Sequence, residues 1–529
     1  MAELYCKVFE EENILTAIKE ILRNEGSKTA GPDGISSRNI KNEKGEIINV
    51  KGIIKEVKMR LRRCKRVNSR TVEIPKSNGK TRTLTIINLY DRIAQQAVYQ
   101  IIGPIVEAKF SKHSYGFRIG LSTKIPVSKI VAGMSNAKHV YTIEIDFSKC
   151  FDNIPLESAI GMAKELGVSN SKLLKTIKHL MYCTKDYNGI GLGQGAILGP
   201  MLANCFLHKM DKWVEENVDT GNRNPSDTEG FKRKDNRYHF AEWIKSRGRK
   251  CHGTYYRYAD DSIIICATRS EQLDIYKRLR EFIDNELKIP VNEEKTRLGY
   301  NCFDFLGYHI KKKRDEASGK WCINITPSDI EGLRKEIKSL TFRSGQACVD
   351  SLKKIVGILN YYDICNNLTW VIKHINDRMY RHTLRHGSNI KCIWNKKDGE
   401  RRYTYIYKGR LYNVSPWEIR RKTKQSSRDY VIHSAWLSLK EQVNDVETDR
   451  YRPYYLERTT LWTKQKGKDY CTGILMNPKR IHIHHLDGNQ RNNKWKNLIL
   501  VSPETHRMIH SIEKTDNRKI LKCRKALKS

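Results

Sequence analysis

The chain has 529 residues, and its 98 Lys and Arg against 59 Asp and Glu leave a net charge of +39. This length suggests about three or four domains, and the charge indicates nucleic acid as the main partner, with an anionic membrane surface as the weaker alternative. No run approaches the roughly 18 apolar residues of a membrane span, and the acidic start does not resemble a signal peptide. We therefore expect a soluble, cytoplasmic protein without a membrane partner. Its 14 cysteines include no C-x-x-C pair, which predicts reduced, mostly packed thiols.

The first part of the chain alternates helical and strand patterns. Residues 1–70 carry apolar side chains at helical spacing, interrupted by G-P-D-G at 31–34. From Arg70, R-T-V-E-I-P, a polar S-N-G turn and R-T-L-T-I predict a hairpin, and a helix follows from about Asp91 to Glu107. V-Y-T-I-E-I-D at 140–146 predicts a strand that ends on an acid.

The α+β pattern ends at about residue 312. Within it, a polar stretch at about 218–250 has almost no apolar period and is interpreted as a surface insertion. Helical periodicity returns at 327–385. Residues 386–450 are basic and aromatic without a clear period, and a last compact segment runs from about 451 to 515.

Two adjacent acids, Asp260 and Asp261, stand between apolar, β-rich runs in Y-Y-R-Y-A-D-D-S-I-I-I-C. Because like charges repel, a bound divalent cation is the simplest reason for this arrangement. Asp146 ends the other acidic strand, so we expect it to fold next to Asp260 as a further ligand. Oxygen ligands without nearby His or Cys suit Mg²⁺, and two such ions can clamp the oxygens of a phosphoryl transfer. The alternative is that the two acids only cap a surface turn.

Further blocks resemble reverse transcriptases, and their order resembles the proteins encoded inside group II introns. S-Y-G-F-R at 114–118 and V-E-I-P-K-S-N-G-K-T-R at 72–82 resemble the fingers of that family. G-Q-G-A-I-L-G-P-M-L-A-N at 193–204 resembles its Q-G block, and V-N-E-E-K-T followed by F-L-G-Y resembles its last palm blocks. The sequence departs from the family at Gly193, where Pro is usual, and at R-T-L-T-I-I.

The resemblance implies that Asp146, Asp260 and Asp261 are catalytic metal ligands and that Tyr258 lies near the primer end. The residues it places at the incoming nucleotide are Lys76, Arg82, Phe151, Gln194 and Lys295. The two cations of the fingers hairpin would neutralise the triphosphate, the Phe ring would exclude a 2′-hydroxyl, the Gln would lie against template and nucleotide, and the last Lys would protonate the leaving pyrophosphate. The three cations and the Phe also have ordinary alternatives, as solvated turn charges, a helix-face charge and a core ring.

G-I-L-N-Y-Y-D-I-C-N-N, Gly357 to Asn367, resembles the start of the maturase-associated thumb of group II intron proteins. Tyr361 and Tyr362 would then bind RNA by stacking or hydrogen bonding, although ordinary helix packing stays open. The basic, Tyr-rich tract that follows would serve a DNA or RNA backbone.

The C-terminal segment I-H-I-H-H-L-D-G-N carries several histidines, and H-x-x-x-H at 506–510 sets two on one helix face. It resembles HNH nucleases with a ββα-metal finger. The resemblance implies that His484, His506 and His510 coordinate Mg²⁺, Mn²⁺ or Zn²⁺, that His485 is the general base and that Asn497 orients His485 or tethers the loop. A purely structural zinc site is the alternative. Cys471 stands alone here, so the extra Cys pairs common in related domains are expected to be absent.

These features predict an α+β multidomain protein: reverse transcriptase fingers and palm of a right hand at 1–312, a helical thumb at 313–390, a basic DNA-binding region at 391–450 and a ββα-metal HNH endonuclease domain at 451–529. The implied partners are intron RNA, target DNA and dNTPs, and the oligomeric state stays open. The implied function is splicing assistance, nicking of target DNA and target-primed reverse transcription. A domesticated or antiphage reverse transcriptase with an appended nuclease and a non-catalytic RNA chaperone are the alternatives.

Overall fold

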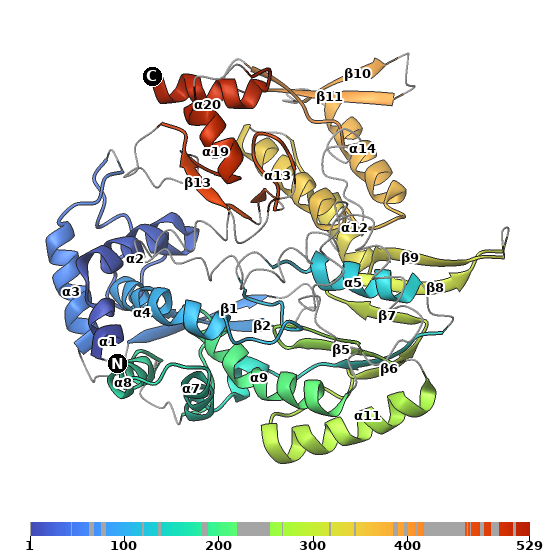
Figure 1. The fold of residues 1–529 in the computed structure, drawn as a ribbon. Coiled ribbons are helices and arrows are strands. Elements are labelled where there is room, and N and C mark those ends of the chain that lie inside the picture. Colours follow the sequence, from blue (N-terminus) through green and yellow to red (C-terminus); the bar gives the residue numbers. More distant parts are fainter. Residues whose placement is uncertain are drawn as a thin grey trace.

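The computed structural model describes residues 2–43, 45–62, 68–75, 81–118, 121–135, 139–181, 189–218, 254–266, 268–316, 319–342, 345–384, 390–395, 400–407, 410–416, 461–462, 464–465, 467–474, 476, 481–487, 497–511 and 515–528. Figure 1 shows helices around several small sheets, with the N-terminal helices at left and the C-terminal helices at the top. In the described part of the chain, no helix has the length and apolar character that crossing a membrane requires.

The N-terminal helices form because their apolar residues recur at helical spacing. In α2 (Glu11–Arg23), Ile14, Ile18 and Ile21 lie on one buried face. This face packs against α4 (Leu89–Glu107), as does α3 (Val50–Arg62). The short α1 (Ala2–Val8) and the 3₁₀ helix η1 (Glu25–Lys28) complete the group. The helices predicted for residues 1–70 and 91–107 are thus confirmed.

The predicted fingers hairpin is present as β1 (Ser69–Pro75) and β2 (Thr81–Ile87), paired antiparallel. Further along the chain come the helices α5 (Lys124–Ser135), α6 (Cys150–Asn153), α7 (Leu156–Glu165) and α8 (Ser171–Met181). The surface insertion expected at about 218–250 lies outside the described residues, apart from Val218.

A four-stranded sheet forms the centre of the palm. Its strands are β3 (Tyr141–Ile145), β4 (Thr254–Tyr258), β5 (Asp261–Cys266) and β6 (Arg297–Tyr300), in the antiparallel order β4-β5-β3-β6. α11 (Arg269–Phe282) packs on β3 and β5, and α9 (Gly199–Asn217) lies nearby and contacts the π-helix η3 (Ile283–Leu287) that follows α11 (Figure 1). A second antiparallel sheet contains β7 (Cys302–Phe305), β8 (Tyr308–Arg314) and β9 (Trp321–Pro327). The expected domain division at residue 312 falls within β8.

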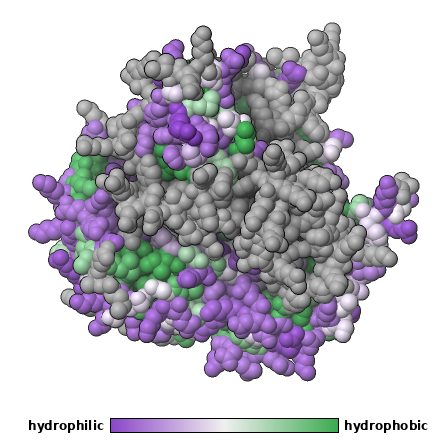
Figure 2. All heavy atoms as spheres, in the orientation of Figure 1, coloured by the Kyte–Doolittle hydropathy of each residue, from purple (hydrophilic) through white to green (hydrophobic). Residues whose placement is uncertain are grey.

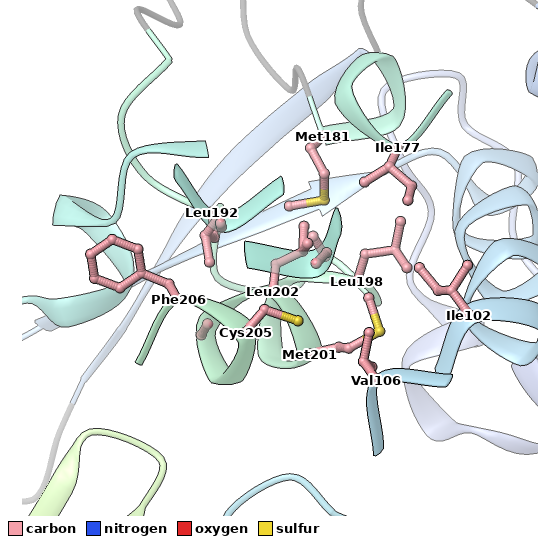
Figure 3. Close-up of a cluster of buried hydrophobic side chains, with 14 of the residues drawn as sticks. Ile102, Val106, Ile177, Met181, Leu192, Leu198, Met201, Leu202, Cys205 and Phe206 are labelled. Carbon is pink, nitrogen blue, oxygen red and sulfur yellow. The ribbon is translucent and has the colours of Figure 1, made fainter. Parts of the chain in front are cut away.

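The two faces of the palm sheet belong to two hydrophobic cores, because successive side chains of a strand point to opposite faces. Ile264 of β5 packs in the first core, with the N-terminal helices and α9. Figure 3 shows side chains of α4, α8 and α9 pointing toward one another in this core. Ile263 and Ile265 pack in the second core, which continues into the thumb helices and reaches Trp462 and Leu498.

The helical periodicity predicted for 327–385 is confirmed by α12 (Ile330–Ser339), α13 (Gly345–Tyr361) and α14 (Thr369–Thr383). Beyond them, β10 (Ile390–Asn395), β11 (Glu400–Tyr407) and β12 (Arg410–Asn413) form an antiparallel sheet where the sequence suggested no clear period. The period is hidden because Tyr403 and Tyr405, rather than aliphatic residues, form the buried face of β11. Residues 417–450 of the expected basic region lie outside the described residues.

The C-terminal elements are β13 (His482–His485), β14 (Leu498–Val501), α19 (Pro503–His510) and α20 (Arg518–Lys528). The two strands pair antiparallel and α19 packs on both of them. At the molecular surface, Figure 2 shows hydrophilic residues over the regions of α3 at left and α11 at the bottom.

Candidate active sites

Three carboxylates meet where β3 ends and the β4–β5 hairpin turns. The hairpin pairs antiparallel around a two-residue turn, Ala259 and Asp260, so Asp261 is the first residue of β5. Ala259 has φ +58°, in the left-handed region that such tight turns use. β3 pairs antiparallel with β5, and continuing their register by one residue sets Asp146 opposite Asp261. The expected neighbourhood of Asp146 and Asp260 is therefore present.

The negative charges of these carboxylates repel one another. Burial raises the pKa of Asp260, and the Asp146 charge raises it further. The pKa of Asp261 rises to about 7 through burial first and then through Asp260 and Asp146. Asp261 is open to water on one side, but protein atoms still displace much of the water around its carboxylate. The positive charges of Lys295 and Arg82 lower the pKa of Asp260 only in part, so a cation here would relieve repulsion.

Asp146 is held by the V-N-E-E-K-T segment. Asn292 Nδ2 donates to Asp146 Oδ2 at 2.9 Å, and Lys295 Nζ donates to Oδ1 at 3.4 Å. The Asp146 backbone N–H donates to Thr296 Oγ1 at 3.3 Å. Asn292 and Thr296 had no role in the sequence-based predictions, although the motif that resembles the family contains both. Lys295 lies at the carboxylates, as its expected role requires.

The donor set fits Mg²⁺, because it consists of carboxylate oxygens, and burial and then the negative neighbours raise the pKa of two of these acids, Asp260 and Asp261. The carboxylate oxygens of Asp146, Asp260 and Asp261 are not all close enough to one another to surround a single ion. Among the residues that the structure describes, only the histidines discussed below form a group of three whose possible ligand atoms all lie within 4.8 Å of one another.

Replacing Asp261 by asparagine is expected to stabilise the protein at pH 8 and to have little effect at pH 4. The folded-state pKa of about 7 exceeds the ordinary value of 3.8, so the folded protein binds this proton more tightly than the unfolded chain. Stability from this group therefore falls as the pH rises from about 4 to 7. In thermal unfolding with EDTA, the variant should melt roughly 2 °C above wild type at pH 8 and close to it at about pH 4. An equal difference at both pH values would contradict the raised pKa.

The structure describes one of the two positively charged residues that were expected on the fingers hairpin. Arg82 lies exposed on β2, and its charge lowers the pKa of Asp260. Lys76 lies outside the described residues.

The loop that carries Gln194 docks on the fingers hairpin. The Thr85 backbone N–H donates to the Gln194 carbonyl at 2.6 Å. Gly195 has φ +117°, and a Cβ there would lie 2.4 Å from the Thr85 carbonyl oxygen, so only glycine fits. Leu192, two residues before Gln194, is anchored in the first core near Leu202 (Figure 3). The loop is thereby fixed at both of its sides, with Gln194 half-buried.

Phe151 lies half-buried on α6 and makes an edge-to-face contact with Phe117, with ring centroids 5.9 Å apart. Phe117 is 48% exposed and has φ +58°, an uncommon backbone conformation for a bulky residue. Phe117 belongs to the quoted S-Y-G-F-R block, but no role was predicted for it. Its exposure and backbone conformation mark it as a candidate contact, and neither can be seen in the sequence.

Tyr361 and Tyr362 end the α13 region and pack on the F-L-G-Y turn. The Tyr361 hydroxyl donates to the Leu306 carbonyl at 2.8 Å, and its ring stacks on Tyr308 at 5.5 Å. The Tyr308 hydroxyl in turn donates to the Tyr361 carbonyl. The packing alternative thus accounts for these contacts, while Tyr361 keeps 37% of its surface exposed.

The end of α13 also lies close to the carboxylates. Burial raises the pKa of Tyr361, and Tyr258 and Asp261 raise it further. Tyr258, expected near the primer end, is half-buried in β4. A cavity of about 590 Å³ between α12 and α13 is lined by both Tyr361 and Tyr362. The thumb therefore presents its exposed tyrosine beside the acidic hairpin.

A second group of ionisable residues forms at the C-terminal β-hairpin and helix. The N-cap Ser502 and the following Pro start α19, and Ser502 Oγ accepts the Thr505 N–H at 3.1 Å. The helix sets His506 and His510 on one face, where both rings lie against His484 of β13. The possible ligand atoms of these three histidines all lie within 4.8 Å of one another.

The three histidines fit a divalent metal. His484 Nε2 is buried with no hydrogen-bond partner. Burial first, and then the neighbouring imidazoles, lower the pKa of His484 and of His506 to about 4 each. Both rings are therefore neutral near pH 7 and able to act as ligands. Imidazole nitrogen suits Zn²⁺ better than Mg²⁺ among the metals considered.

His485 lies outside the three-histidine cluster. As the next residue of β13 it points to the other face of the strand, and it is buried. Asn497 accepts the Asp487 backbone N–H at 3.0 Å and donates to its carboxylate at 2.7 Å, which supports the loop-tether alternative. His482, for which no role was predicted, brings its ring to 5.0 Å from that of His506.

Cys471 has a neighbouring thiol in the fold. Its side chain interacts with that of Cys523 on α20, and both side chains are buried. Sequence spacing could not show this pair, because the two residues are far apart in the chain and meet only when α20 folds back. Most of the described cysteines are buried, as expected.

Zn²⁺ is expected to raise the melting temperature of the EDTA-treated protein, and His506→Ala should remove most of that increase. A ligand that binds only the folded state at 100 times its Kd adds roughly 2.7 kcal/mol to stability. Thermal unfolding at pH 7 with and without Zn²⁺ measures the effect. His374→Ala, an exposed α14 residue bonded to the Trp370 carbonyl, is the control. The same Zn²⁺ shift in both variants would count against the three-histidine site.

The palm and fingers match a known protein family. Residues 74–310 match the family model described as "Reverse transcriptase (RNA-dependent DNA polymerase)". This part of the chain is therefore similar to reverse transcriptases. It contains the three carboxylates, the Gln194 loop and Lys295, and its fold is mixed α/β as predicted.

The relatives reach beyond the reverse transcriptase domain. The chain is 28% identical to protein YkfC of Escherichia coli, over 49% of this chain and 71% of that protein. It is 26% identical to the group II intron-encoded protein LtrA of Lactococcus lactis, over 80% of this chain and 79% of LtrA. Its likeness to the putative COX1/OXI3 intron 1 protein of Saccharomyces cerevisiae is 25% identity over 59% of this chain, and covers 44% of the yeast protein. The similarity to LtrA thus covers more of the chain than residues 74–310.

Proposed function

We propose that this chain is a group II intron-encoded reverse transcriptase that copies RNA into DNA at Asp146, Asp260 and Asp261. The convergence of these carboxylates at one end of the palm sheet, within a reverse transcriptase domain, carries the proposal. A surface turn that merely tolerated two acids would not need a third from a different strand. The raised pKa of Asp261 adds support, because it marks a site that lacks positive charge.

The nucleotide site follows from the residues around the carboxylates. Asp146, Asp260 and Asp261 would hold Mg²⁺, which supplies charge neutralisation for the attacking and leaving oxygens. Arg82 would neutralise the triphosphate, Gln194 would border template and nucleotide, and Phe151 would exclude the 2′-hydroxyl. Lys295 is within 3.4 Å of Asp146 and would deliver a proton to pyrophosphate. Lys76 belongs to the same proposal through its sequence motif alone.

The proposed RNA partner is the intron that encodes the chain. The similarity to LtrA across 80% of the chain supports it, as does the thumb that follows the palm. Tyr361 and Tyr362 would contact this RNA, and dNTPs and target DNA would complete the substrates. The net charge of +39 suits such polyanions.

A second proposed activity is DNA nicking at the C-terminal histidines. His484, His506 and His510 form a site for Zn²⁺, Mn²⁺ or Mg²⁺, and the β-strand pair followed by a helix has the order of a ββα-metal finger. His485 would act as the general base, with Asn497 holding the loop beside it. The exposed 3′ end of the nicked strand would prime reverse transcription.

Primer extension on an RNA template tests the polymerase. The purified chain, a DNA primer annealed to a structure-free RNA and dNTPs should give full-length cDNA with Mg²⁺ and none with EDTA. Substitution of ribonucleotides should give little product. Absence of cDNA from the wild-type chain would overturn the proposal in favour of an RNA chaperone.

Sequencing the RNA that co-purifies with the protein tests the intron assignment. A structured RNA that flanks the coding region and ends in a catalytic hairpin domain is expected for an intron protein. Recovery of unrelated RNAs, together with cDNA activity, would instead indicate a domesticated or antiphage reverse transcriptase.

A further inference from the structure

Arg257 lies on β4 behind the acidic turn and is fully buried, with 0% of its surface exposed. Each of its N–H donors has an acceptor at 2.6–2.9 Å. Two bonds go to the Asp211 carboxylate, and the others go to Asn204, Ser114 and the carbonyl of Ala259. A guanidinium has five such donors, so its hydrogen-bonding capacity is used completely.

The partners of Arg257 come from three separate parts of the reverse transcriptase domain. Asn204 and Asp211 lie on α9, and Ser114 belongs to the S-Y-G-F-R block, which forms a parallel bridge with β4 at Arg257. Burial by itself raises the pKa of Asp211, but the Arg257 charge outweighs it and keeps that pKa well below its usual range. The pair therefore stays ionised.

Gly116 contacts the acidic turn at a second point. The Gly116 carbonyl accepts a hydrogen bond from Asn204 Nδ2 at 2.8 Å. A Cβ at Gly116 would lie 2.2 Å from the Ala259 backbone nitrogen, so the two backbones touch directly. Arg257 and Gly116 thus both contact the backbone of Ala259, the residue that immediately precedes Asp260.

We propose that Arg257 is a positioning residue for RNA-templated DNA synthesis, because its bond to the Ala259 carbonyl fixes the turn that aims the Asp260 carboxylate. This inference rests on the proposed polymerase function. An ion pair retained only for stability is a weak choice, since apolar packing of similar volume is often as stable. Fixing a catalytic group is a better reason, because a displacement of about 1 Å can cost about 10²-fold in rate.

Arg257→Lys is the decisive variant. Lysine keeps the positive charge beside Asp211, but its three donors lack the planar fork and cannot serve all four partners. We expect kcat for single-nucleotide incorporation to fall about 10²-fold, with the KM for dNTP little changed and with more Mg²⁺ needed for half-maximal rate. A loss of stability alone would lower the active fraction without changing the Mg²⁺ dependence.

Arg60→Lys is the matched control. Arg60 of α3 and Asp91 of α4 form a second largely buried Arg–Asp pair, with Nη1 and Oδ2 3.0 Å apart. The same substitution there should cost stability without raising the Mg²⁺ requirement. Thermal unfolding of both variants shows that the compared proteins are folded.

Gly116→Ala keeps the inference testable if Arg257→Lys does not fold. Its added Cβ pushes on the backbone nitrogen of the same residue, Ala259, while leaving the ion pair in place, so it should reproduce the kcat loss and the raised Mg²⁺ requirement. Wild-type kinetics in both folded variants, or changes identical to those of Arg60→Lys, would overturn the positioning role. Absence of cDNA from the wild type would overturn the polymerase proposal itself, which separates the two failures.

Discussion

Asp260→Asn is expected to lower RNA-templated DNA synthesis by about 10³-fold or more while leaving the protein folded. The substitution preserves the size of the side chain and removes one of the charges that would hold Mg²⁺. A loss of about 4 kcal/mol of transition-state stabilisation corresponds to this factor. Because burial and Asp146 raise the pKa of Asp260, neutralising it should not destabilise the fold. Single-turnover primer extension at saturating dNTP measures the rate.

Asp274→Asn is the control for this substitution. Asp274 is an exposed acid of α11 that pairs with Arg278 one helical turn away, and exposed pairs of this kind contribute little to stability. Its cDNA synthesis should equal that of the wild type. If Asp260→Asn retained more than about a tenth of the wild-type rate, a loss of under about 1.4 kcal/mol, the assignment of this carboxylate to the chemistry would be wrong.

His485→Ala is expected to slow nicking of duplex target DNA by about 10²- to 10⁴-fold, the usual contribution of a general base. His485 is not one of the three histidines that converge, so Zn²⁺ binding should be retained. Extension of a pre-annealed primer should also be unchanged, because that assay needs no nick. The nicking rate on supercoiled DNA carrying the flanking sequence of the gene is the measurement.

Two further variants serve as comparisons in the nicking assay. His506→Ala should lose both the metal and the nicking, which separates a ligand from a base. His309→Ala, on the palm strand β8 where its ring bonds to Asp304, should nick normally. Nicking at the wild-type rate by His485→Ala would remove the assigned base, and nicking by His506→Ala would remove the metal site.

Much of the fold could be predicted because the relevant patterns are local. Ile14, Ile18 and Ile21 repeat at helical spacing, and the fingers hairpin carries a polar turn between two β-rich runs. The sheet of β10 to β12 was not predicted, because tyrosines rather than aliphatic residues stand at alternate positions of β11 and tyrosine occurs about as readily at the surface as in a core. Tyr403 is in fact fully buried.

The candidate sites were predictable where chemistry alone restricts the residue type. Adjacent aspartates and a His-x-x-x-His pair are costly without a partner, so their residues could be named in advance. The supporting residues were not predictable. The supporting contacts join segments that are remote in sequence, as those of Arg257, Gly116 and the Cys471–Cys523 pair do. An arginine, a glycine or a cysteine is by itself common in any chain.

The second core extends without interruption from the palm sheet through the thumb helices to Trp462 and Leu498. The C-terminal segment that carries the histidines is therefore not packed independently of the thumb: cutting the chain before residue 451 would expose apolar surface of the thumb and favour aggregation. Heat or mutation in α13 or α14 should disable both chemistries together, since regions that share buried contacts unfold as one cooperative unit. If either activity is lost in evolution, we then expect substitution of its ionisable residues rather than deletion of its segment.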